Sequence, residues 1–211
     1  MFRNLLINII CIFCYCSSFS QTKNTILKPD VIGIYYGFGN QHNILFDDTD
    51  YSYKTQFLKA SFQYYLNNKV YRWGLAVQPQ IHFLKHQLLN PFFVRNIEEN
   101  FEEDRIIFTK LKSMQLYALE FEINVRRSIT KNLEVSAFFG FGPAIIDTRT
   151  ERLAKGFTFI ENIGLGIHYK LFKKLFLEFR PTFNHVSNAG IKLPNSGYNV
   201  VNLEIGFSWS L

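Results

Sequence analysis

The sequence predicts an all-β protein, an eight-stranded antiparallel transmembrane β-barrel, and three observations point to this class. Apolar and polar residues alternate over several long segments, which is the period of a strand whose two faces meet different surroundings. Beyond the N-terminal region, no stretch approaches the about 18 consecutive apolar residues of a membrane-spanning helix. Short and long connections alternate between these segments, as in outer-membrane barrels.

The N-terminal segment, residues 1–20, has the features of a secretory signal peptide. Arg3 supplies a positive charge, residues 5–15 form a short apolar run, and residues 18–20 have the small-x-small pattern of a cleavage site. All three cysteines of the chain lie within this segment. We therefore expect an exported barrel domain over residues 21–211, without disulfide, thiol or cysteine–metal chemistry.

The composition favours an outer-membrane barrel or a secreted β-sandwich. The chain holds 23 Phe and 11 Tyr but only 6 Pro and 12 Gly, and its net charge of +6 suits a neighbour that carries phosphates. Phosphate-cradling glycine loops, nucleic-acid motifs and sets of His, Cys or carboxylates at metal-ligand spacing are not found. We expect no nucleic-acid partner, no cofactor and no metal.

Eight strand-like segments are expected after the signal peptide, several of them long enough to cross a membrane at a tilt. Tight turns on one rim and longer loops on the other predict short periplasmic turns and longer extracellular loops. An acidic run at 98–104, within the longest connection, is interpreted as a solvated loop. The strands are expected at 30–39, 54–66, 70–85, 113–127, 132–147, 156–170, 174–187 and 198–211. The tight turns lie at 67–69, 128–131 and 172–174, and the longer loops at 40–53, 86–112, 148–155 and 188–197.

The alternation assigns a direction to each face. In 113–127 the odd-numbered residues from 119 to 125 are apolar and the even-numbered ones are polar or charged, and 174–187 and 198–211 divide in the same way. We interpret the apolar face as lipid-facing and the polar face as lumen-facing, where charges have to pair. The lumenal charges are Glu120, Glu122, Glu134, Glu178, Glu204, Arg126 and Arg180. Candidates for interfacial aromatic girdles are Tyr35, Tyr36, Tyr64, Tyr65, Tyr71, Trp73 and Trp209.

The end of the seventh segment carries the pattern with the most chemistry. His185 and Ser187 are two residues apart and share one face of a strand, so a base lies beside a hydroxyl nucleophile. Because the odd positions of this segment are predicted to face lipid, the pair lies outward at the extracellular end. The alternative is that a lipid-facing row simply ends at the rim, where His and Ser meet headgroups and water.

The fifteen residues from His185 to Asn199, H-V-S-N-A-G-I-K-L-P-N-S-G-Y-N, resemble the lipid A 3-O-deacylases. These are outer-membrane barrel esterases that remove an acyl chain from lipopolysaccharide. The resemblance implies a protein of the bacterial outer membrane that acts on lipid A, with Ser187 as nucleophile and His185 as base.

The loop after this pair contains three candidate donors to an oxyanion, by the same resemblance. They are Asn188, Asn195 and the backbone N–H of Gly190, and the alternative is ordinary turn chemistry, in which these residue types dominate. Lys192 is a candidate substrate-binding residue in this loop.

Two residues are candidates to orient His185. The resemblance implies a glutamate two residues after the last glycine of the loop, and Asn199 stands there instead. An amide can orient a histidine but supplies no negative charge. The second candidate is Glu161, because a tight turn at 172–174 would place position 161 opposite 185. The alternative for Glu161 is a place among the headgroups.

Other interpretations stay open at the level of the sequence. Arg149, Arg152 and Lys155 are further candidates for contact with lipid A phosphates, although rim cations are common in such barrels. The departure at Asn199 keeps open a non-catalytic small barrel with a structural or adhesive role. A soluble periplasmic β-sandwich is a third alternative, and the sequence leaves open whether the barrel forms a homodimer.

Overall fold

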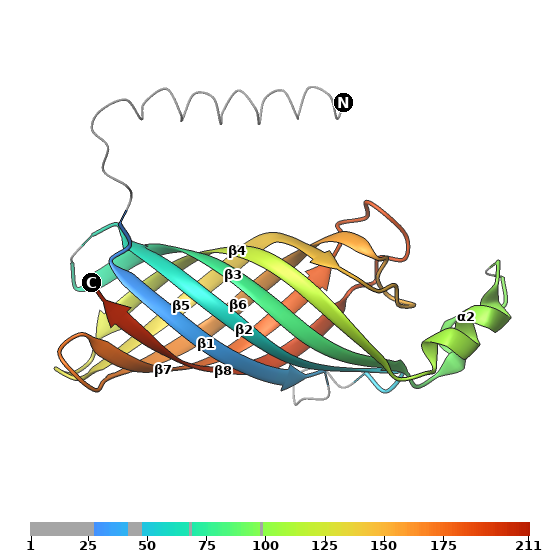
Figure 1. Cartoon of the computed structure of the whole chain (residues 1–211), viewed down its shortest axis with the longest axis horizontal. Coiled ribbons are helices and arrows are strands. Elements are labelled where there is room, and N and C mark those ends of the chain that lie inside the picture. The colour runs from blue at the N-terminus through green and yellow to red at the C-terminus, as the bar shows by residue number, and fades with distance from the viewer. Residues whose placement is uncertain (1–27, 42–47, 68, 98) are drawn as a thin grey trace, which may run out of the picture.

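The computed structural model describes residues 28–41, 48–67, 69–97 and 99–211 and shows a closed barrel of eight antiparallel strands (Figure 1). The strands follow one another in chain order, and β8 pairs with β1 to close the barrel. The predicted fold class is therefore confirmed. The expected signal peptide and the cysteines lie outside the described residues. The strands are β1 (Val31–Asn40), β2 (Tyr51–Tyr65), β3 (Tyr71–Leu88), β4 (Lys112–Ser128), β5 (Leu133–Ile146), β6 (Gly156–Lys170), β7 (Leu175–Ser187) and β8 (Tyr198–Ser210).

The two ends of the barrel differ as predicted. Tight turns and the C-terminus lie at one end, and the longer loops gather at the other (Figure 1). The longest connection departs from the prediction, because it contains the 3-10 helix η1 (Pro91–Phe93) and the helix α2 (Phe101–Phe108). Three acidic residues of the run that was expected to be a solvated loop occupy the first turn of α2, where they complement the helix dipole. None of the helices in the described part of the chain is long and apolar enough to cross a membrane.

The outer surface of the barrel is apolar, and the predicted directions of the two faces are confirmed. In β4 the odd-numbered residues Leu119, Phe121 and Ile123 are exposed, whereas Glu120 and Glu122 between them are buried in the lumen. Four of the girdle candidates also lie exposed on the outside, as expected for side chains at a membrane interface. They are Tyr36, Tyr71, Trp73 and Trp209.

Tyr35 departs from this pattern, and its assignment to the girdle was wrong. Its side chain is only 3% exposed and lies in the lumen, where its hydroxyl donates to Glu178 over 2.8 Å. The ring fits because glycines surround it. A Cβ on Gly33 would lie 2.7 Å from the ring, and one on Gly206 would lie 2.3 Å from it. Small residues of its own strand and of β8 thus make room for a large inward side chain in a narrow barrel.

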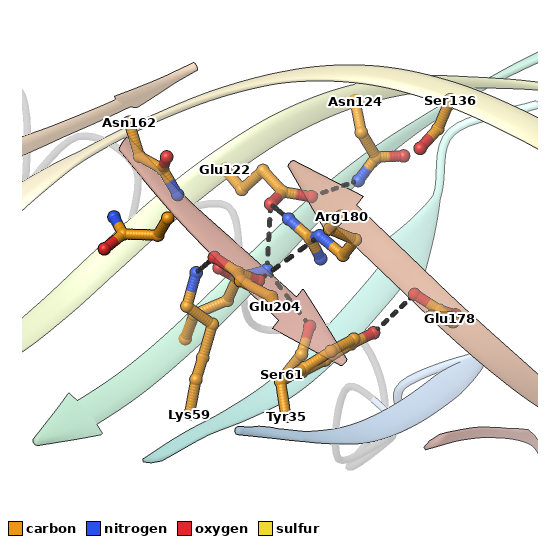
Figure 2. A network of polar contacts seen from close by, with 12 residues as sticks. Tyr35, Lys59, Ser61, Glu122, Asn124, Ser136, Asn162, Glu178, Arg180 and Glu204 are labelled. Atoms are coloured by element: carbon orange, nitrogen blue, oxygen red, sulfur yellow. Dashed lines mark hydrogen bonds and ion pairs between the residues drawn. The ribbon is translucent and has the colours of Figure 1, made fainter. Parts of the chain in front are cut away.

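The middle of the lumen is filled by a paired network of charges, which Figure 2 shows. Lys59 lies 2.8 Å from Glu204 and 3.9 Å from Glu120, and all three side chains are buried. Arg180 pairs with Glu122 and, through its Nε, with Glu204 over 3.4 Å. The expectation that lumenal charges would pair is confirmed.

Toward the loop end, the lumen changes from charged to apolar. Side chains of the strands and of the 148–155 loop form one buried cluster that includes Tyr53, Leu153 and Tyr198. His86 and Glu151 are buried there as a pair, with Nε2 and Oε2 2.8 Å apart. The 148–155 loop is therefore anchored inside the mouth of the barrel, next to the 188–197 loop.

Candidate active site

The candidate site lies on the outer face, where β6, β7 and β8 meet the loop end. His185 near the end of β7 is directly opposite Asn199 at the start of β8, and on its other side it is opposite Glu161 of β6. All three side chains and that of Ser187 are partly exposed, on the face of the barrel that alternates with the lumenal one. The predicted register of positions 161 and 185 is confirmed.

Asn199 holds the imidazole of His185. Its side-chain oxygen lies 2.7 Å from Nδ1 of the histidine. Because an amide oxygen only accepts, Nδ1 carries the proton, and Nε2 is left with a lone pair. The ring is therefore oriented and held in the tautomer that a general base needs.

Glu161 does not share this contact. Its side chain is half-buried beside the histidine, but among the described residues no hydrogen bond joins it to His185. The two candidates for orienting the base thus differ in the structure, because Asn199 contacts the ring and Glu161 only flanks it.

Ser187 is the last residue of β7, and its backbone is held by a neighbouring strand. The hydroxyl of Thr158 donates to the Ser187 carbonyl oxygen over 2.6 Å. Ser187 lies two residues from His185 on the same face, so the hydroxyl and the imidazole are neighbours along one row. In the described structure the Ser187 hydroxyl makes no hydrogen bond of its own.

Gly197 packs directly against this pair, a role that sequence reasoning missed. A Cβ at this position would lie 3.2 Å from the His185 ring, 3.2 Å from the Ser187 Cβ and 2.5 Å from the Val186 carbonyl oxygen. Its φ of +65° is also in the region that favours glycine. At the last glycine of the motif, the loop backbone thus lies against the candidate catalytic side chains.

The three candidate oxyanion donors have different surroundings. The side-chain amide of Asn188 donates to the Lys192 carbonyl oxygen over 2.6 Å, and its oxygen accepts from the Gly190 N–H over 3.1 Å. Asn188 is only 1% exposed, so it and Gly190 hold the turn together in this structure. The oxygen of Asn195 accepts from the Asn188 N–H over 2.7 Å, which leaves the Asn195 NH₂ without a partner among the described residues. Lys192 is exposed at the tip of the loop.

The 148–155 loop braces the 188–197 loop from behind. Arg152 Nε donates to the Gly197 carbonyl oxygen over 2.7 Å, and the Gly197 N–H donates back to the Arg152 carbonyl oxygen over 3.0 Å. Leu153 and Asn195 form a β-bridge next to this clamp. The guanidinium also stacks 4.1 Å above the Tyr51 ring. The structure therefore gives Arg152 a structural contact at the site.

A cavity of about 820 Å³ opens beside the site loop, between that loop and the two preceding ones. Its wall combines apolar side chains such as Phe93 and Leu193 with Arg149, and Asn195 belongs to the same wall. Arg149 pairs with Asp104 over 2.9 Å at the edge of this space. Among the residues that the structure describes, no group of His, Cys, Asp or Glu could hold a metal ion.

The chain is similar to known proteins both in sequence and in fold. Residues 117–208 match the family model described as lipid A 3-O-deacylase (PagL), a stretch that includes the whole site. No curated protein matches the sequence. The crystal structure of the outer-membrane enzyme PagL matches with a TM-score of 0.54 and 11% identity, covering 85% of this chain and 99% of that one.

Two further solved barrels are similar in shape. Neisserial surface protein A has a TM-score of 0.43 and 10% identity, with 86% of this chain and 96% of that chain covered. Ail of Yersinia pestis has a TM-score of 0.38 and 14% identity, with 85% and 99% covered. This chain is thus an eight-stranded barrel of the bacterial outer membrane that, over residues 117–208, resembles the lipid A 3-O-deacylases.

Proposed function

We propose that this protein is an outer-membrane esterase that hydrolyses an ester-linked acyl chain of lipid A with a Ser187 nucleophile and a His185 base. The observation that carries the proposal is the 2.7 Å contact between Asn199 and His185 Nδ1, because it leaves Nε2 as a base next to Ser187. The family match over residues 117–208 supports the substrate class. The outward direction of the pair suits an ester that lies in the outer leaflet.

The reaction would run in two steps through an acyl-enzyme. The Ser187 oxygen attacks the ester carbonyl carbon while His185 Nε2 takes the hydroxyl proton, and the carbonyl oxygen becomes an oxyanion. The ester C–O bond then breaks, and the leaving oxygen of the lipid takes the proton from His185. A water molecule repeats the sequence on the acyl-serine, with His185 again taking and returning the proton, and the fatty acid is released.

Asn195 is the best-placed of the three candidate oxyanion donors. Its NH₂ group makes no contact with a described residue, whereas Asn188 and the Gly190 N–H are engaged inside the loop. A donor that is already fixed by the loop costs little reorganisation when charge develops on the substrate. The second oxygen-binding contact would come from a backbone N–H in the same turn.

The deciding experiment is mass spectrometry of lipid A from cells that express the wild type or Ser187→Ala. We expect the wild type to remove one acyl chain, and the variant to be at least about a thousandfold slower, as when a nucleophile of a catalytic pair is deleted. Ser210→Ala, which deletes a hydroxyl at the opposite rim, serves as the matched control and should behave as the wild type. Unchanged lipid A with all three proteins would favour the non-catalytic barrel.

A further inference from the structure

Two lysines face each other on the outer surface of the barrel, far from His185. Lys54 of β2 is directly opposite Lys85 of β3, and both side chains are exposed on the lipid-facing side. Among the described residues, neither ammonium group pairs with a carboxylate. Like charges at facing positions of two strands repel each other, so an anion bound between these groups would stabilise the arrangement.

The lysines line a groove of about 680 Å³ on the outer ends of β1–β4. Phe38 and Phe83 supply apolar surface within it. Ser113 lines it as well, so hydroxyl, ammonium and apolar groups meet in one depression. This combination fits a molecule with a charged head and hydrocarbon chains.

One carboxylate borders the groove and is already engaged. Asp147 accepts from the backbone N–H of Gln115 over 3.0 Å and from the Thr148 hydroxyl over 2.8 Å, both through Oδ1. Asp147 thus holds the start of the loop after β5, and within the described part of the chain it forms no ion pair with either lysine, so two ammonium groups face one carboxylate in the groove. The net charge that the groove presents to the membrane stays positive.

The strand order separates this groove from the candidate active site. Going round the closed barrel, three strands lie between β3 and β7 in either direction, so the lysine pair and His185 are on opposite sides. Both are near the end that carries the longer loops, because Lys54 lies close to the start of β2 (Tyr51) and Lys85 close to the end of β3 (Leu88). A single lipid at the catalytic pair could not also fill this groove.

We propose that the groove binds a phosphate of a lipopolysaccharide molecule in the outer leaflet, as a lipid site separate from the candidate active site. The two ammonium groups share one phosphate, and Lys is a suitable point charge for that purpose. The acyl chains of the lipid run along Phe38 and Phe83. The proposal rests on the location in the outer membrane and does not require that the protein is an esterase.

Native mass spectrometry of the purified barrel in detergent, with added bisphosphorylated lipid A, tests the proposal. All proteins carry Ser187→Ala, so that no lipid is consumed and the result is independent of any esterase activity. We expect Lys54→Gln/Lys85→Gln to lower the population of lipid-bound barrel at least fivefold. The matched control is Lys173→Gln/Lys174→Gln, which removes two exposed lysines at the opposite rim and should bind as the parent does.

Two further arms identify what is recognised. Lys54→Arg/Lys85→Arg keeps both charges and should restore binding, and the heat-dependent shift in gel mobility shows that each variant is folded. Lipid A from which both phosphates have been removed should bind the parent at least fivefold less than the bisphosphorylated form. Equal binding of the parent and the Gln variant, or of the two lipids to the parent, would overturn the proposal.

Discussion

At the scale of single residues, the candidate site has a neutral side chain, Asn199, at the position where the resemblance implies a glutamate. Asn199 fixes the His185 ring through its amide oxygen, so orientation and tautomer are provided. What it does not provide is a negative charge beside the imidazolium that would form in the proposed reaction, when His185 takes the proton of Ser187. The arrangement therefore separates two contributions, orientation and charge, that a carboxylate would combine.

Substitution of Asn199 measures these two contributions. We expect Asn199→Glu to raise the deacylation rate about tenfold, since a carboxylate stabilises the transient imidazolium. Asn199→Ala should lower the rate about a hundredfold, because the ring is no longer held in the reactive geometry. The measurement is kcat on purified lipid A in mixed micelles. If Asn199→Ala were as fast as the wild type, the contact with His185 would have no role in catalysis.

Glu161 provides the matching test on the other side of the ring. Because it flanks His185 without a hydrogen bond, we expect Glu161→Gln to cost less activity than Asn199→Ala in the same assay. A larger loss from Glu161→Gln would instead make this carboxylate the group that orients the base.

At the scale of elements, two loops form one unit behind the site. The clamp between Arg152 and Gly197 joins the 148–155 loop to the 188–197 loop, and the first of these is anchored in the barrel mouth through Glu151 and His86. The position of Gly197 against His185 and the position of the loop in the mouth are therefore coupled by direct contacts.

The close approach at Gly197 can be tested without changing any polar group. A Cβ there would be 2.5 Å from a backbone oxygen, so we expect Gly197→Ala to push the loop away from His185 and to reduce kcat at least about tenfold. Gly156→Ala is the control, because Gly156 also has a positive φ but a Cβ there would meet nothing within 4 Å. A similar loss of activity in both variants would assign the effect to backbone strain alone.

The strands were predictable from the sequence, and the contacts between loops were not. Alternation with a period of two assigns every strand residue to a face, and the tight turn at 172–174 then determines which residue of β6 faces His185. The clamp of Arg152 on Gly197 joins positions 45 residues apart and follows no local pattern. Tyr35 was misassigned because its inward place depends on glycines, one of which is on β8.

At the scale of the whole molecule, the interior of the barrel has two parts with different chemistry. The loop end is an apolar cluster, whereas the middle of the lumen is a network of buried charges. A network of buried charges does not by itself show that a protein is stable. Removing one member is nevertheless destabilising, because it leaves the opposite charge buried without a partner. The network and the site are joined by the strands, because Arg180 and His185 both belong to β7.

Lys59 is the member of the network whose loss should be most visible. Its ammonium group lies between Glu120 and Glu204, and the residue is only 2% exposed. We expect Lys59→Met to lower the free energy of unfolding by about 3–5 kcal/mol, the usual cost of leaving a buried charge unpaired. Urea unfolding of the barrel in lipid vesicles measures this change. The control Lys173→Met removes an exposed lysine and should shift the free energy by less than about 0.5 kcal/mol.

The double variant Lys59→Met/Glu204→Gln tests how much of this stability loss comes from a carboxylate left without its cation and how much from altered packing of the lumen. Because the second substitution removes one of the two charges that Lys59 neutralises, it should recover part of the stability that the single variant loses. A double variant less stable than Lys59→Met would mean that Glu204 contributes mainly through Arg180, its other cationic partner. In either case the site on the outer face should keep its geometry as long as the barrel stays closed, since β7 and β8 hold His185 and Asn199 in register.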